Sequence, residues 1–137
     1  MRKIVRLVAA ALIAVGCAHH ERIARVHDVA DLPPGFAVVV ATFETVPDQS
    51  AFGEAQVIED AYYVAGRLSV MGYQSFVVHD SQRRVRVGVR ASTHALARSL
   101  EREIEAAGVI DLGDGNILPV PEPELINMAE LQLRTAP

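Results

Sequence analysis

An alternation of arginine and valine near the middle of the chain constrains its fold more than any other feature. The alternating residues are Arg84, Val85, Arg86, Val87, Gly88, Val89 and Arg90. A period of two places successive side chains on opposite faces of a strand, and β-branched valine packs well on a pleated, half-buried surface. The pattern therefore predicts a strand with one buried valine face and one open, basic face.

The basic face has two interpretations. The chain as a whole is acidic, with a formal net charge of −4, so a strip of arginines stands out as a surface that can bind hydroxyl or carboxylate groups. The same arginines can instead be the solvated side of an antiparallel strand. The residues alone favour the solvated side.

Two further elements precede this strand. Residues 36–43 carry apolar side chains on both faces, which is typical of a central strand covered on both sides. Residues 54–71 place apolar side chains along one helical face, and Gly72 ends the helix. The apolar stripe consists of Ile58, Ala61, Tyr62, Ala65 and Leu68.

The later elements repeat this scheme. Residues 73–79 form a hairpin with the arginine strand, and Ser92 is a good N-cap for a second amphipathic helix over 93–107. One of the two segments 109–112 and 117–120 is then the fourth strand.

The order strand, helix, strand, strand, helix, strand predicts an α+β fold. A split βαβ, ferredoxin-like arrangement fits this order best: a four-stranded antiparallel sheet with two helices on one face. We expect the domain to span 35–120, because two prolines and a glycine mark its start. Residues 121–137 form a C-terminal tail, in which 124–133 predict a short helix that can lie against the uncovered apolar face of the first strand.

The N-terminus predicts export. Residues 1–16 combine a short basic region with an apolar run too short to span a membrane, which is typical of a signal peptide. Residues 17–34 then form a polar tether. Cleavage removes three of the 13 basic side chains and none of the 17 acidic ones, so the net charge falls from −4 to −7. That charge and the export signal argue against nucleic acid as a partner.

The single cysteine, Cys17, cannot form an internal disulfide. Small residues at Ala14 and Gly16 make its surroundings resemble a bacterial lipobox. The resemblance implies cleavage before Cys17, acylation of that residue by chains such as palmitate, and anchoring in a membrane. Ala18 is typical of sorting to the outer membrane, facing the periplasm. The alternative is an ordinary signal peptide with an incidental cysteine.

Chemistry beyond binding has little support in the residues. No nucleophile with a base, no phosphate loop and no metal-ligand spacing is recognisable. His19 and His20 lie beside Cys17, but we interpret them as part of the polar spacer, since an acylated cysteine is no ligand. The sequence therefore predicts a protein that is not an enzyme and that holds no cofactor and no metal.

The segment from Phe36 to Gly108 resembles a SPOR domain, the sporulation-related module of bacterial cell-wall proteins. The resemblance rests on the first strand, the helix that ends at Gly72-Tyr73, the arginine strand and the helix after it. The family implies binding to peptidoglycan, especially glycan strands stripped of stem peptides, on the open face of the sheet. This chain has Val39 where the family typically carries glutamine, and Ala41 where it carries glycine.

The resemblance implies a set of ligand-binding residues on that open face. They are Arg84, Arg86 and Arg90, with Thr42 and Ser75 assisting. The predicted function is therefore a cell-envelope lipoprotein that binds peptidoglycan without catalysis. The alternative is a protein–protein interaction or self-association module, such as a homodimer, that uses the apolar face of the first strand.

Overall fold

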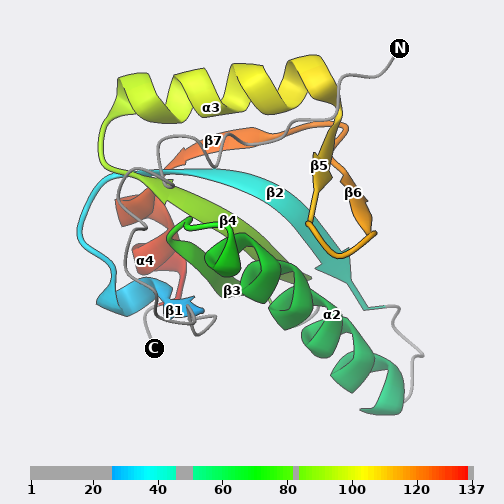
Figure 1. The fold of residues 1–137 in the computed structure, drawn as a ribbon. Helices are drawn as coiled ribbons and strands as arrows, with labels where there is room; N and C mark the ends of the chain where they lie inside the picture. Colours follow the sequence, from blue (N-terminus) through cyan, green and yellow to red (C-terminus); the bar gives the residue numbers. More distant parts are fainter. Residues whose placement is uncertain (1–25, 46–50, 82–83, 136–137) are drawn as a thin grey trace, which may run out of the picture.

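The computed structural model describes residues 26–45, 51–81 and 84–135 (Figure 1). A five-stranded sheet of order β1-β3-β4-β2-β7 forms its centre. These strands are β1 (His27–Asp28), β2 (Phe36–Glu44), β3 (Ser75–Ser81), β4 (Arg84–Ala91) and β7 (Glu124–Asn127). Strand β1 runs parallel to β3, and the other neighbours are antiparallel. Strands β5 (Val109–Asp111) and β6 (Ile117–Pro119) pair only with each other.

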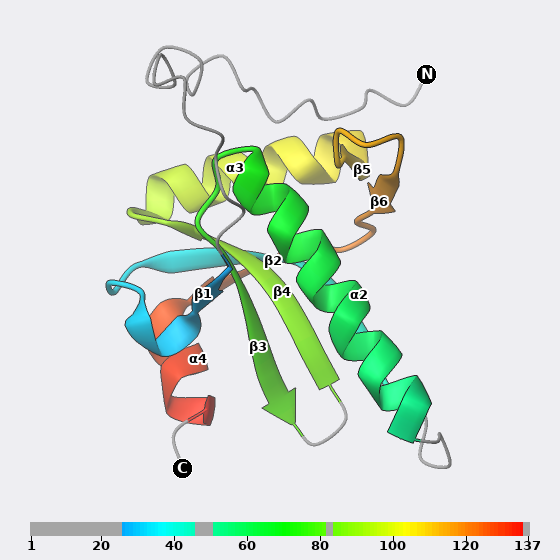
Figure 2. The ribbon, with the colours of Figure 1, turned by 60° about the horizontal axis from the view of Figure 1, so that its bottom comes forward.

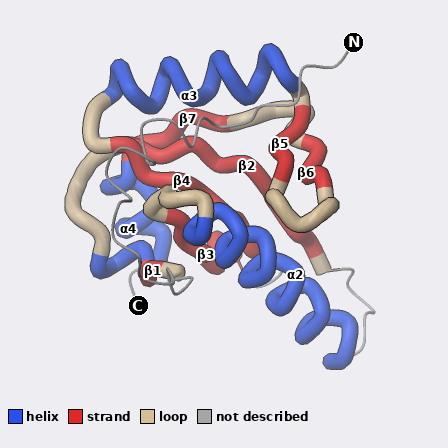
Figure 3. Tube along the Cα trace, in the orientation of Figure 1, coloured by secondary structure: helices blue, strands red, loops and turns tan. Residues whose placement is uncertain are grey.

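Helices cover both faces of this sheet. The first face carries α2 (Ala51–Val70) and α3 (His94–Ala107), and the second carries the 3-10 turn η1 (Val29–Asp31) and α4 (Met128–Thr135) (Figure 2). The tube drawing shows the same layers, with α3 and α4 on opposite sides of the strands (Figure 3). The first core unites the valines of β4 with Val38 and apolar residues of both long helices.

The second core overturns the prediction of an open basic face. It consists of Val29, Leu32, Ala37, Val39, Phe76, Val78, Ile126, Met128 and Leu131. The valine face of β4 is buried as predicted, but Arg86 on the other face is only 4% exposed. The ring of Phe76 lies over Gly88, where no side chain competes for the space. The alternation of arginine and valine correctly indicated that the two faces of β4 differ in polarity. It did not indicate that helices cover both faces.

The α+β fold is confirmed, while the four-stranded antiparallel sheet is wrong. On the side away from β4, β2 pairs with β7. The predicted fourth-strand segments, 109–112 and 117–120, form their own small hairpin. Residues 124–133, predicted as one helix, are a strand followed by a helix. Asn127 separates the two, because its side chain accepts a hydrogen bond from the N–H of Ala129 at 2.9 Å.

The boundaries of the other predicted elements shift by a few residues. Helix α3 is capped by Thr93, whose hydroxyl accepts from the N–H of Leu96 at 3.2 Å, and not by Ser92. Gly108 ends this helix with φ of 72°, a conformation that glycine adopts without strain.

The segment before β2 belongs to the folded unit as far as it is described. Residues 26–34, assigned above to the tether, contribute β1, η1 and the buried side chains of Val29 and Leu32. The amide of Gln132 on α4 donates to the carbonyls of both residues, at 3.2 and 3.3 Å. The predicted signal peptide, Cys17, His19 and His20 lie outside the described residues. Within those residues, no helix has the length and apolar character needed to cross a bilayer.

Candidate functional site

Arg86 lies across the second face of the sheet and pairs with an acid of the chain itself. It stands opposite Thr42 on β2 and Val78 on β3, and its Nη2 forms an ion pair with the carboxylate of Glu124. The Arg86 side chain is 5% exposed, whereas that of Glu124 is 55% exposed. A buried guanidinium needs such a counter-ion, so Arg86 has a structural role.

Arg90 also binds its own chain. Its guanidinium donates to the carbonyls of Pro33 and Pro34, at 2.9 and 2.8 Å, and to the side chain of Gln74 at 2.9 Å. These bonds tie the segment that enters β2 to the segment that enters β3. Arg90 therefore positions two strands.

Ser75 lies on the opposite face from the arginines. It is fully buried, and its hydroxyl donates to the carbonyl of Ala65 in α2 at 2.6 Å. The residue of β4 that stands opposite Ser75 is Val89, whose side chain faces the helices. The prediction that Ser75 assists the arginines is wrong, because the register of β3 turns this side chain toward α2.

The far end of the second face remains uncovered, and we call it the sheet end. It consists of Thr42 and Glu44 on β2 with Arg84 on β4, which stands opposite Glu44. Thr42 and Glu44 are exposed and Arg84 is half-buried. Of the five predicted site residues, the structure thus brings Thr42 and Arg84 together at an accessible surface.

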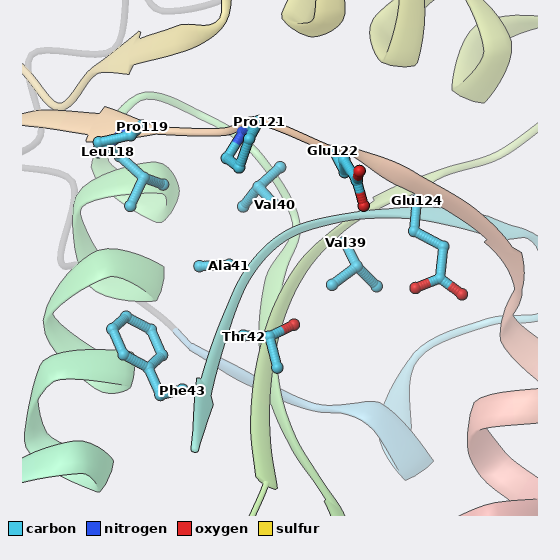
Figure 4. A pocket seen from close by; sticks show the side chains of 10 residues that line it. All are labelled: Val39, Val40, Ala41, Thr42, Phe43, Leu118, Pro119, Pro121, Glu122 and Glu124. Carbon is cyan, nitrogen blue, oxygen red and sulfur yellow. The ribbon is translucent and has the colours of Figure 1, made fainter.

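A cavity of about 360 Å³ adjoins the sheet end, and we call it the slot (Figure 4). Its lining residues are Val39, Val40, Ala41, Thr42, Phe43, Leu118, Pro119, Pro121, Glu122 and Glu124. One wall is therefore the outer edge of β2, and the other is the proline-rich segment between β6 and β7. Such volumes are typical of ligand sites, which span roughly 300–1,000 Å³.

The slot opens where β2 parts from β7. A bulge interrupts the register of β2 between Val39 and Ala41, and pairing with β7 ends at Val39. A bulge bends its strand and increases the local twist. Figure 4 shows β2 curving away from the segment that carries Pro119 and Pro121. The irregularity thus creates the space between the two walls.

The proline-rich wall is anchored to its surroundings. The N–H of Val120 donates to the carbonyl of Gly108 at 2.9 Å. The turn before β6 is fixed to α2, because Asn116 donates to the hydroxyl of Tyr63 at 2.8 Å and Arg67 donates to the carbonyl of Leu112 at 3.0 Å. These bonds fix the position of the wall relative to α2 and to the end of α3.

Glu122 and Glu124 of this wall were not among the predicted site residues, because residues 121–137 were expected to form a tail. The signal was present as three prolines that alternate with other residues over 119–123. Proline removes backbone donors and favours an extended chain, so this run favours an extended segment before residue 124.

A second cavity of about 580 Å³ lies at the β1 edge of the sheet. It is lined by Val26, His27, Asp28, Val29, Ala30, Tyr62, Val77, Val78 and His79. Among the described residues, β1 pairs with β3 only at Phe76 and Val77. The cavity therefore lies at the edge of the sheet where this two-residue strand ends.

Lining residues of the slot offer carboxylates, one hydroxyl and apolar walls, with no cysteine, histidine or lysine among them. No group of three or more potential metal ligands occurs among the described residues.

Tyr73, which lines neither cavity, has a shifted pKa. Burial, and then the charge of Glu103, raise the pKa of Tyr73 to about 12. This phenol therefore stays protonated at neutral pH.

Comparisons with protein-family models, with curated proteins and with solved structures found no match to this chain.

Proposed function

We propose that this chain is a bacterial cell-envelope lipoprotein whose SPOR-like domain binds peptidoglycan glycan strands without catalysis. In the proposed cell location, acylated Cys17 anchors it in the outer membrane, facing the periplasm. The strand order supports the SPOR-like assignment. Strands β7, β2, β4 and β3 are neighbours in that order, and the helices that follow β2 and β4 share one face. A split βαβ unit has this arrangement, with β1 added here at its edge.

The sheet end is the observation that carries the binding proposal. Thr42, Glu44 and Arg84 present a hydroxyl, a carboxylate and a guanidinium at one accessible surface. The half-exposed carboxylate of Glu124 lines the slot together with Thr42. Sugar hydroxyls donate to carboxylates and accept from guanidinium groups. Stripped glycan strands carry such hydroxyls and also a lactyl carboxylate on each muramic acid, which the guanidinium of Arg84 can bind.

The site proposed here is displaced from the one that the family resemblance implies. Val39, which stands where the family carries glutamine, is buried in the second core. Arg86 is covered and paired with Glu124. The middle of the sheet face is therefore occupied by the chain itself, and a glycan strand would lie across the sheet end.

Retention on purified cell-wall sacculi tests this function. The mature chain should sediment with amidase-treated sacculi, and Arg84→Ala combined with Thr42→Val should release most of it. Arg102→Ala is the matched control, because Arg102 is exposed on α3 and should leave retention unchanged. A native chain that stays in the supernatant even with amidase-treated sacculi would refute the proposal.

The alternative function, a protein–protein interaction or self-association module, required the apolar face of β2 to be accessible. Ala37 and Val39 are buried against Met128 and Leu131 of the same chain. A partner or a second copy could use the apolar face of β2 only by displacing α4. No observation in the structure favours that displacement.

A further inference from the structure

We propose that the slot binds an extended, basic peptide segment, which adds as a strand to the outer edge of β2. This interaction goes beyond glycan binding and does not depend on it. It is carried by three features of the described residues: a strand edge without a strand partner, a facing wall that lacks backbone donors at two prolines, and a carboxylate without an ion-pair partner.

The strand edge is the first feature. On its inner side β2 pairs with β4 as far as Glu44, which stands opposite Arg84. On its outer side β2 pairs with β7 only from Phe36 to Val39. Residues 40–44 therefore have no strand partner on the outer side among the described parts of the chain. Such an edge presents backbone N–H and C=O groups that an added strand can satisfy.

The facing wall is the second feature. Pro119 and Pro121 have no backbone N–H, so at these positions the wall cannot donate hydrogen bonds to an inserted chain. Together with Leu118 they form an apolar surface across from Ala41 and Phe43 (Figure 4). A guest would thus make its main-chain bonds to β2 and pack side chains against the wall.

The size of the slot fits a short stretch of strand. One residue of an extended chain advances about 3.3 Å, and strands and sheets are spaced about 4.8 and 10 Å apart, which gives roughly 160 Å³ per residue. The slot holds about 360 Å³. It therefore encloses about two residues of a guest, whose flanking residues lie outside.

Charge is the third feature and sets the chemistry of the guest. The lining includes Glu122 and Glu124 and no lysine or arginine. Arg86 neutralises Glu124, whereas exposed Glu122 has no ion-pair partner among the described residues. A lysine or arginine near Glu122 is favoured, and an acidic side chain there is repelled.

Amide NMR of the isotope-labelled mature chain tests the proposal with a defined probe. The probe is a capped pentapeptide of alternating threonine and valine with lysine at its centre. Its titration should shift the amide signals of residues 40–44. The same peptide N-methylated at its valines, or with glutamate for lysine, should bind at least tenfold more weakly, because it loses main-chain donors or the favourable charge.

Variants of the protein provide the second arm of the test. Glu122→Lys should weaken the lysine peptide at least tenfold, while Glu130→Lys, an equal charge change at an exposed site of α4, should not. Absence of shifts at millimolar peptide, equal binding of the N-methylated probe, or an unchanged affinity of Glu122→Lys would each overturn the proposal. Since Glu122→Lys leaves Thr42 and Arg84 intact, its retention on sacculi reports separately on glycan binding.

Discussion

Replacing Glu124 by glutamine should destabilise the fold, because it removes a carboxylate that pairs with the buried guanidinium of Arg86. The Arg86 side chain is 5% exposed and that of Glu124 is 55% exposed. Breaking a fully buried ion pair costs about 3–5 kcal/mol, and an exposed pair contributes about 0–1 kcal/mol. Because only one partner is buried here, we expect a loss of about 2 kcal/mol in the free energy of unfolding.

Urea unfolding at neutral pH measures this loss, and a double-mutant cycle identifies its source. Arg86→Met removes the buried charge together with its need for a partner. If the cost arises from the stranded charge, Glu124→Gln should destabilise Arg86→Met far less than it destabilises the native chain. Glu122→Gln is the matched control, because this exposed carboxylate forms no ion pair among the described residues. Additive effects around the cycle, or equal stability of the Glu124→Gln variant and the native chain, would show that the pair does not stabilise the fold.

Three further predictions concern single positions. Gly88→Ala should lower the free energy of unfolding by about 1–3 kcal/mol, because its methyl group would collide with the Phe76 ring; in thermal denaturation Gly66→Ala, which meets no neighbouring atom, should be neutral or stabilising. Tyr73 should titrate near pH 12 by ultraviolet absorbance. Since its folded pKa lies above the ordinary tyrosine value of 10.0, stability should fall as the pH rises from about 10 to 12, and Tyr73→Phe should remove this dependence. Cys17→Ser should abolish incorporation of labelled palmitate in bacteria; continued labelling would contradict the lipobox assignment.

Local periodicity predicted the elements whose side chains pack nearby. Strands β2, β3 and β4 and helices α2 and α3 occur where alternation and the helical repeat placed them, within a few residues. Burial of both faces of β4 was not accessible in this way. Arg86 has a polar side chain in a polar pattern, and its burial depends on Glu124, 38 residues away. A pattern within one strand carries no information about a counter-ion that arrives from another.

The prediction of a single helix over 124–133 was wrong for a related reason. Leu125, Met128 and Leu131 recur every three residues, as in a helix, yet the first of these lies in β7 and the other two in α4. Short apolar runs are ambiguous between helix and strand, and here pairing with β2 decided the outcome. Tertiary contact also explains why this segment belongs to the sheet instead of forming a tail.

One inserted residue in β2 determines the geometry of both proposed surfaces. Strict alternation would place Thr42 on the same face as Val38, toward the helices. The bulge between Val39 and Ala41 reverses the faces beyond it, because a one-residue shift turns every later side chain over. Thr42 therefore stands opposite Arg86 on the arginine face, and Ala41 and Phe43 pack with Val38 against the first core. The same bend ends the pairing with β7 and opens the slot, so the exposed hydroxyl and the unpaired strand edge share a single structural cause.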